Sequence, residues 1–350
     1  MMAYSIQKAD LSTHKGCLQD LWQRNFEGVE SKRYEWIYEN NPGGEPIVFL
    51  LKHDEKDSFV GAISMFPRTV HALDKKIKAY ICGDMVVDVQ HRALGPAVKL
   101  LKAAINHCQQ EEQCLLISFP NQKSGPVTLR VGFKVLANVT QMTRVIRTEA
   151  YLKRQFKSKM LTRLLSLPTD WLMQLRYDAS LIFKQLNYSC EIKNSFDESF
   201  DALLIEQSKN YSFVGSRTVK YLNWRINQSP YKKYQTFVVR SKKQQRISGY
   251  IAFSINDNRV EIIDFASDGQ TETIQVLFHL FLKYQKTQKC DAVSLAFAGG
   301  SGLINLLKRR GFSVRDESGQ VVVFSSSATL NPVQLIDNSN WYLTAVDNDI

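Results

Sequence analysis

Hydrophobic and polar residues along the chain form two series of segments. In order, the first series predicts a helix over 11–26, strands over 47–51, 59–66 and 79–89, a helix over 96–110, a strand over 115–119, a helix over 127–131 and a strand from Phe133. Apolar residues such as Val98, Leu101 and Ile105 recur with the helical period, whereas β-branched residues favour strand over 79–89. Residues 68–78 are expected to form a long arm between two strands.

The second series follows the same course. It predicts strands near 236–239, 248–254 and 259–266, a helix over 273–286, a strand over 292–297 and a helix over 303–310. Antiparallel strands followed by alternating helices and strands indicate a mixed α/β layer rather than a sandwich or a bundle. We therefore expect two similar units, each with a mixed, mostly antiparallel sheet flanked by helices.

Repeated residues connect the two series. Trp36, Pro42, Phe49, Gly61 and Ile63 reappear 188 positions later as Trp224, Pro230, Phe237, Gly249 and Ile251. Further pairs in the same order are Asp84 with Asp264, Asp88 with Asp268, and Gly132-Phe133 with Gly311-Phe312. A repeat of this length is a duplicated domain, because solenoid periods are only about 20–50 residues. The predicted divisions are domains over 1–150 and 191–326, a bridge over 151–190 and a tail over 327–350.

The composition of the chain indicates its cellular compartment and its class of protein. The 350-residue chain is long enough for two cores, and it has no apolar run of the roughly 18–20 residues that span a bilayer. Its beginning is polar, unlike a signal peptide. The six cysteines are scattered without a Cys-x-x-Cys pair, which favours reduced thiols in the cytoplasm over a disulfide framework or a metal site.

The positive charge of the chain indicates which kinds of partner it could bind. The formal net charge is +11, and residues 144–184 hold nine Lys and Arg against three Asp and Glu. An anionic cosubstrate, an acidic membrane surface or nucleic acid would each suit this charge, and so would a purely solubilising role. The bridge is expected to form two short helices that either pack against both domains or lie on an anionic membrane.

The segment with the clearest chemistry is residues 87–97, VDVQHRALGPA. A strand runs into a small-residue turn and then a helix, whose first N–H groups and positive dipole end suit a phosphate group. Gly95 permits close backbone approach, and Pro96 is tolerated in the first helical turn. The plain structural alternative is that Gly95 only shapes the turn.

This turn resembles the acyl-CoA signature of the GNAT acyltransferase superfamily, (Gln/Arg)-x-x-Gly-x-(Gly/Ala). Arg92, Gly95 and Ala97 fill its fixed positions, and Gly132-Phe133 matches the closing Gly-Phe of the family. The resemblance implies that the turn holds the pyrophosphate of an acetyl-CoA or other acyl-CoA cosubstrate, while the preceding strand pairs with the pantetheine arm. The implied cofactor-binding residues are Met85, Val86, Val87, Arg92, Ala93, Leu94, Gly95, Ala97 and Asn121.

The chain departs from the family pattern in informative places. The Tyr that many members use as general acid is Thr128 here and Leu307 in the second copy. Pro96 removes one amide donor from the turn. The second copy has Gly269-Gln270-Thr271-Glu272-Thr273 where the signature should lie, so its cofactor site is expected to be lost and its role to be shaping an acceptor cleft.

Asp84 is the candidate catalytic residue. It lies on the strand expected beside the thioester and would accept the proton of an amine directly or through water. Its repeated counterpart Asp264 leaves a structural role open. Cys82 and Cys114 have no recognisable His partner, so an acyl-enzyme is not expected. The tail, with Trp341-Tyr342-Leu343-Thr344 and an Asp-x-Asp at 347–349, resembles the endings of GNAT-like proteins in bacterial cell-surface polysaccharide pathways, and no metal is assigned to it.

These observations predict a cytoplasmic N-acyltransferase that acts on a small amine, with an amino sugar suggested by the tail. One alternative is a tandem-GNAT enzyme that draws on aminoacyl-tRNA, although no basic helical arm for RNA is obvious and nucleic acid is not the expected partner. Another is a non-catalytic binding protein that keeps the fold as a scaffold. The sequence leaves the acyl chain length and the oligomeric state open.

Overall fold

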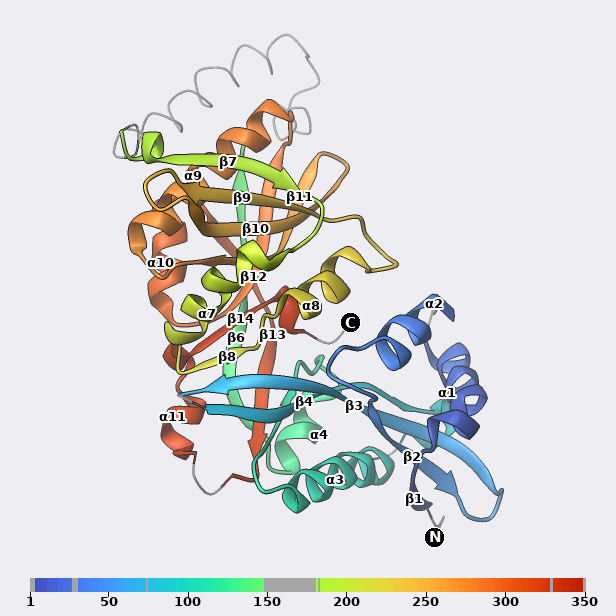
Figure 1. The fold of residues 1–350 in the computed structure, drawn as a ribbon. Helices are drawn as coiled ribbons and strands as arrows, with labels where there is room; N and C mark the ends of the chain where they lie inside the picture. The colour runs from blue at the N-terminus through green and yellow to red at the C-terminus, as the bar shows by residue number, and fades with distance from the viewer. Residues whose placement is uncertain are drawn as a thin grey trace.

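The computed structural model describes residues 4–26, 31–73, 75–92, 94–147, 181, 183–327 and 330–348. Most of the predicted bridge over 151–190, including the two helices expected there, lies outside these residues. Figure 1 shows an elongated molecule in which long strands run from one half into the other. We call residues 4–147 the N-terminal half and residues 183–348 the C-terminal half.

The N-terminal half has the predicted elements in the predicted order. It adds a first strand, a short α-helix, a π-helical turn and a 3-10 turn that the sequence pattern did not reveal. Its elements are β1 (Tyr4–Lys8), α1 (Leu11–Asn25), α2 (Ser31–Tyr34), η1 (Glu35–Glu39), β2 (Ile47–His53), β3 (Ser58–Ala72), β4 (Lys75–Val87), η2 (Val89–His91), α3 (Leu94–Gln110), β5 (Cys114–Ser118), α4 (Gly125–Arg130) and β6 (Lys134–Val145). The side chain of Asp10 caps α1 by accepting from the amide of Ser12.

The C-terminal half repeats most of this order. Its elements are η3 (Lys184–Asn187), β7 (Tyr188–Lys193), η4 (Glu198–Phe200), α7 (Asp201–Lys209), β8 (Phe213–Gly215), α8 (Val219–Leu222), η5 (Asn223–Asn227), β9 (Gln235–Ser241), β10 (Arg246–Asn256), β11 (Arg259–Ser267), α9 (Thr271–Thr287), β12 (Ala292–Gly299), α10 (Ser301–Arg309) and β13 (Ser313–Ser325). The tail adds α11 (Pro332–Ile336), η6 (Asn338–Asn340), β14 (Trp341–Thr344) and η7 (Ala345–Asp347). The mixed α/β fold class is confirmed.

Two local expectations were wrong. The arm expected over 68–78 is strand, because β3 continues to Ala72 and pairs with β4 as far as Ala72 opposite Lys75. The cysteines are not all free thiols: Cys108 and Cys114 are joined by a disulfide, with their Cα atoms 5.5 Å apart. The turn between α3 and β5 brings this pair together, which spacing alone did not indicate.

The two halves share one sheet, in the order β1-β2-β3-β4-β5-β13-β6-β12-β11-β10-β9-β7. In this order β6 and β13, the last strands of the two element series, have changed places between the halves. β13, which follows α10 of the C-terminal half, pairs with β5 through Val322 opposite Ser118. β6, which follows α4 of the N-terminal half, pairs with β12 through Val145 opposite Ala292. Each half therefore completes its sheet with a strand from the other.

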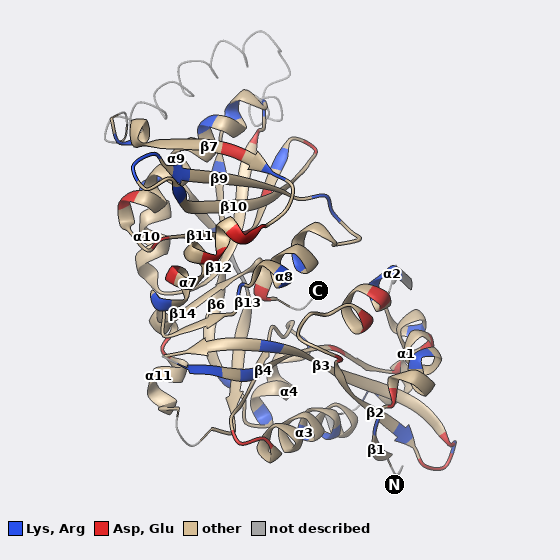
Figure 2. Ribbon diagram, in the orientation of Figure 1, with Lys and Arg blue, Asp and Glu red and all other residues tan. Residues whose placement is uncertain are grey.

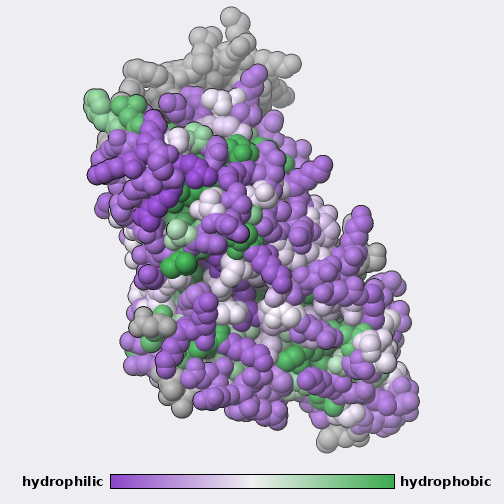
Figure 3. All heavy atoms as spheres, in the orientation of Figure 1, coloured by the Kyte–Doolittle hydropathy of each residue, from purple (hydrophilic) through white to green (hydrophobic). Residues whose placement is uncertain are grey.

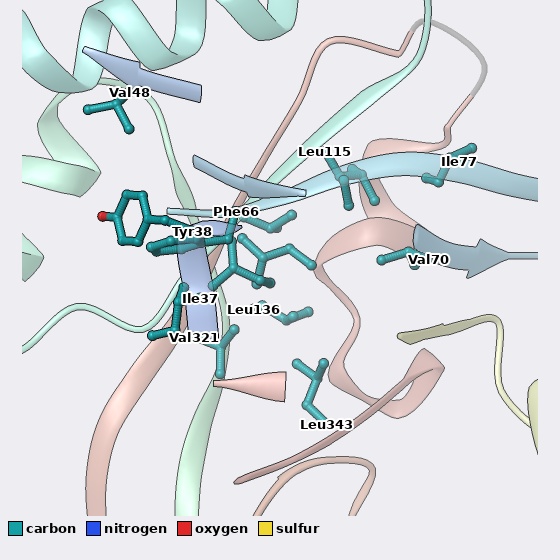
Figure 4. Packing of buried hydrophobic residues seen from close by; sticks show 14 of the residues in the cluster. Ile37, Tyr38, Val48, Phe66, Val70, Ile77, Leu115, Leu136, Val321 and Leu343 are labelled. Carbon is teal, nitrogen blue, oxygen red and sulfur yellow. The ribbon is translucent and has the colours of Figure 1, made fainter. Parts of the chain in front are cut away.

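The core reflects this exchange. One buried cluster joins Tyr38 and Phe66 of the N-terminal half with Val321 of β13 and Leu343 of β14, and Figure 4 shows these side chains around Leu136. Burying apolar surface in such a cluster stabilises the folded state by roughly 25 cal/mol for each Å² removed from water. The face in Figure 3 is mainly hydrophilic, with hydrophobic residues in small groups. The cores of the halves thus merge at the exchanged strands.

Candidate functional site

The candidate site lies where β4 and β5 diverge. The two strands pair in parallel from Lys78 opposite Cys114 to Cys82 opposite Ser118. β5 then ends, whereas β4 continues to Val87. A cavity of about 310 Å³ occupies the divergence and borders α3 and α4. We call it the β4–β5 cavity; its lining is Phe26, Ile63, Cys82, Gly83, Asp84, Met85, Leu101, Ser118, Phe119, Pro120, Asn121, Ser124 and Thr128.

A β-bulge shapes the β4 wall of this cavity. Gly83 pairs with Ser64 and Val86 pairs with Ala62, so Asp84 and Met85 together oppose the single residue Ile63. Asp84 has φ of 49°, a left-handed conformation that Asp tolerates better than most side chains. Because a bulge interrupts the hydrogen-bond ladder, it leaves backbone groups for a ligand beside the strand. This is the stretch that the sequence assigned to the pantetheine arm.

Asp84 is held by two partners from the segment that follows α1. Arg33 donates to both carboxylate oxygens, at 2.7 and 2.5 Å, and the Tyr38 hydroxyl donates to Oδ2 at 2.8 Å. Burial, reinforced by the Asp84 carboxylate, raises the pKa of Tyr38 well above its ordinary value. Asp84 is the only carboxylate among the described residues that line the β4–β5 cavity. Sequence reasoning missed Arg33 and Tyr38, because no local pattern connects them to β4.

The turn between β4 and α3 has the form expected of a phosphate site. Arg92 donates from Nε to the carbonyl oxygen of Val87 at 2.9 Å and also reaches Asn25, so its guanidinium braces the turn. The helix begins at Leu94, and Gly95 in its first turn is exposed, with no atom within 4 Å of the Cβ position. The start of α3 is thus open to solvent at Gly95. Ala93 and the side chain of Leu94 lie outside the described residues.

The other predicted contacts divide between the β4–β5 cavity and the core. Met85 lines the cavity, whereas the side chain of Val86 is buried in the core on the other face of the sheet. Val86 therefore has only backbone to offer a cosubstrate. Val87, like Met85, packs against the core cluster that includes Leu100 and Leu101 of α3. Ala97 lies in the first turns of α3 and does not line the cavity.

Asn121 and Thr128 reach the cavity from its far wall. Asn121 Oδ1 accepts from the amides of Lys123 and Ser124, which leaves its Nδ2 without a described partner. The buried Thr128 hydroxyl donates to the carbonyl oxygen of Ser124 at 2.7 Å. Thr128 thus lines the cavity with its hydroxyl already engaged in α4.

The corresponding opening of the C-terminal half is filled by the tail. β11 and β12 pair as far as Ile262 opposite Leu295, and beyond this point β12 pairs with β14. The Tyr342 hydroxyl donates to the carbonyl oxygen of Phe265, and Thr344 donates to Asp264 at 2.7 Å. Because β14 bonds to both diverging strands, it occupies the position that remains a cavity between β4 and β5.

Buried charges anchor the tail. Arg217 bonds Asp264 and also Asp347, the latter at 2.5 Å, and Arg68 of β3 bonds the other Asp347 oxygen at 2.9 Å. Burial opposes ionisation of Asp347, but Arg217 and Arg68 outweigh it, so the pKa of Asp347 lies below its ordinary value. Asp347 is thus engaged by cations of the protein. Asp349, its partner in the Asp-x-Asp pattern, lies outside the described residues.

Comparison of the sequence with protein families identifies the class of protein that has this site. Residues 5–136 match the family model of an acetyltransferase (GNAT) domain, a range that contains β4, β5, the turn and α3. No curated protein matches the sequence. The resemblance to the GNAT superfamily is therefore confirmed over residues 5–136, and the chain contains an acyltransferase domain of the GNAT type.

Solved structures share the fold over nearly the whole chain. A conserved protein of unknown function from Enterococcus faecalis V583, described as a probable N-acyltransferase, matches 95% of this chain and 74% of its own, with a TM-score of 0.67 and 13% identity. A GCN5-related N-acetyltransferase from Anabaena variabilis matches 92% and 72%, with a TM-score of 0.66 and 12% identity. The N-myristoyltransferase of Saccharomyces cerevisiae, solved with myristoyl-CoA, matches 100% and 90%, with a TM-score of 0.55 and 12% identity. Identities this low establish the fold alone.

Among the described helices, none is long and apolar enough to cross a membrane.

Proposed function

We propose that this protein is an acyl-CoA-dependent N-acyltransferase, with acetyl-CoA as donor and a small amine as acceptor. The observation that carries the proposal is the β4–β5 cavity, whose wall includes the bulge at Asp84 and Met85. The chain leads from this wall to the open first turn of α3 at Gly95. Bound acyl-CoA would supply an activated thioester. The pantetheine arm would follow β4, and the pyrophosphate would meet the amides beside Gly95.

A short acyl group fits the walls of the β4–β5 cavity. Ile63, Cys82 and Leu101 line it, and each is no more than 4% exposed because it belongs to the packed core. A long acyl chain would have to displace these side chains, and such overpacking costs about 1–3 kcal/mol. We therefore favour acetyl over a fatty acyl group.

The proposed reaction is direct attack of the amine on the thioester within a ternary complex. Asp84 would accept the amine proton directly or through a water molecule, because a carboxylate can accept about four hydrogen bonds and Arg33 and Tyr38 supply three. The C–N bond forms as the C–S bond breaks, and CoA leaves as the thiolate, which takes a proton from water to give the free thiol. The acceptor class suggested by the tail resemblance is an amino sugar of a cell-surface polysaccharide pathway.

We further propose that the chain arose by duplication of one GNAT domain, with the second copy no longer binding a cosubstrate. Support comes from the repeated element order and from β14, which lies in the second opening.

The charges on the surface do not favour an RNA partner. Figure 2 shows Lys and Arg spread over both halves among Asp and Glu, so this face has no single basic stripe that RNA would follow.

Calorimetric titration with acetyl-CoA tests the proposal. The wild type is expected to bind at one site per chain with micromolar affinity. Gly95→Trp should weaken binding by about tenfold or more, roughly 1.4 kcal/mol, because the indole would fill the cradle of the pyrophosphate. Gly302→Trp is the matched control, since Gly302 is also exposed in the first turn of a helix with no atom within 4 Å of its Cβ position. Absence of binding to the wild type would overturn the proposal.

A further inference from the structure

A second cavity, of about 640 Å³, lies where the exchanged strands cross between the halves. We call it the interhalf cavity. Its walls come from the end of β5, from β6 and β13, and from β11, β12 and β14. Neither half could form it alone, because β6 and β13 cross from one half to the other at this point (Figure 1). Its volume falls within the roughly 300–1,000 Å³ of small-molecule sites.

The interhalf cavity shares a wall with the β4–β5 cavity. Phe119, Pro120 and Asn121, which directly follow β5, line both cavities. A molecule in one cavity therefore contacts the same short segment as a molecule in the other. Such an arrangement suits two reactants that must meet at the end of β5.

The side chains of the interhalf cavity indicate a neutral, hydrogen-bonding ligand. Its polar lining is dominated by amides: Asn121, Gln122, Gln141, Gln320 and Asn348. Each amide offers donors and an acceptor, as hydroxyl-rich ligands require. The side chains of Gln122, Gln141 and Asn348 have no hydrogen-bond partner among the described residues, so their bonding capacity is available to a ligand.

Charge contributes little to this lining. Glu261 is its only charged residue among those described, and Lys232 already pairs with that carboxylate. A polyanion would find no cation in these walls, and a polycation would find one carboxylate that is already paired. Apolar groups such as Val139 and Leu343 complete the lining and offer contact to a carbon ring.

We infer that the interhalf cavity is the acceptor site, and that the acceptor is an amine carried on a neutral, polyhydroxylated, sugar-sized body. Gln141 and Gln320, which lie on the two exchanged strands, would bind its hydroxyl groups. The inference rests on the proposed function, because it places the amine beside the segment 119–121, which the cavity of the acyl donor also contacts.

The test compares acceptors and one lining residue. Glucosamine and galactosamine represent the proposed class, whereas spermidine and the peptide Gly-Ala-Ala-Ser represent charged and peptidic amines. With acetyl-CoA as donor, thiol release should be fastest with an amino sugar. Gln141→Leu should raise the KM for that sugar about tenfold, the effect of about 1.4 kcal/mol from lost hydrogen bonds, without changing acetyl-CoA affinity. Gln334→Leu, at an exposed position of α11, is the matched control.

A binding measurement separates this inference from the proposed function. Saturation-transfer NMR of the two amino sugars needs no turnover, and it should show a signal with the wild type that Gln141→Leu loses. If acetyl-CoA binds but neither sugar gives a signal, or if spermidine or the peptide is the better acceptor, the inference is overturned and the acyl-CoA site stands. An unchanged KM in Gln141→Leu would also overturn it. Sugar binding without acetyl-CoA binding would overturn the proposed function instead.

Discussion

The indole Nε1 of Trp36 donates to the carbonyl oxygen of Trp224 at 2.9 Å, and the indole Nε1 of Trp224 donates to the carbonyl oxygen of Trp36 at 2.8 Å. The ring centroids lie 5.5 Å apart, and both residues belong to π-helical turns, η1 and η5. A reciprocal contact of this kind is characteristic of a two-fold symmetric interface. The two halves thus meet through equivalent positions of the sequence repeat.

We expect Trp36→Phe and Trp224→Phe each to lower the free energy of unfolding by about 1–3 kcal/mol, because each leaves a buried carbonyl oxygen without its donor. Urea denaturation measures the change. Trp22→Phe is the control, since Trp22 is equally buried but its Nε1 has no partner among the described residues. Equal losses in all three variants would show that ring size, and not the reciprocal hydrogen bonds, determines the effect.

Asp84 and Asp264 provide a matched pair for the catalytic proposal. Each carboxylate is paired with a buried arginine and accepts from a tyrosine hydroxyl. We expect both Asp→Asn variants to lose stability by up to about 3–5 kcal/mol, because each leaves an arginine uncompensated. Asp84→Asn alone should also lower kcat by about 100-fold or more, measured as thiol release at a temperature where both variants remain folded. Equal kcat values in the two variants would assign Asp84 a structural role only.

Acid should release the tail. The folded pKa of Asp347 is below its ordinary value of 3.8, so the unfolded chain binds its proton first as the pH falls. The stabilising contribution of Asp347 is therefore complete above about pH 4 to 5 and is lost as the pH falls through the folded pKa. Asp347→Asn should unfold more easily at neutral pH, by about 3–5 kcal/mol, and should lose this part of the acid dependence.

Urea titrations between pH 3 and 7 measure the acid dependence of both proteins. The exposed Asp201→Asn at the start of α7 serves as the control and should change the free energy of unfolding by no more than about 0.5 kcal/mol. Parallel pH curves for the wild type and Asp347→Asn would refute the role given to this ion pair.

The strand exchange predicts that the halves do not fold independently. A chain of residues 1–147 lacks β13, which pairs with both β5 and β6, and β12, which pairs with β6. One edge of β5 and both edges of β6 are then unpaired. We expect this fragment to aggregate in size-exclusion chromatography, and co-expression with residues 148–350 to recover a soluble complex. A stable monomer of residues 1–147 would contradict the importance of the exchange.

Local sequence was sufficient for most of the elements and for the turn between β4 and α3. Helical periodicity placed α3 within two residues of its start, and Gly95 with Arg92 marked the turn, because both signals depend on short-range backbone geometry. The repeated residues indicated two similar halves before any contact was known. These local signals do not specify which strands pair with one another.

Tertiary structure decided the rest. The exchange of β6 and β13, the pairing of Arg33 with Asp84, and the position of β14 between β11 and β12 join residues that are distant in the sequence. The amides of the interhalf cavity, such as Gln141 and Gln320, belong to no recognisable sequence motif. They form a candidate site only because the two strands that carry them lie side by side in the fold. Short-range propensity fixes where a strand lies along the chain, whereas the burial of faces and edges selects its neighbours.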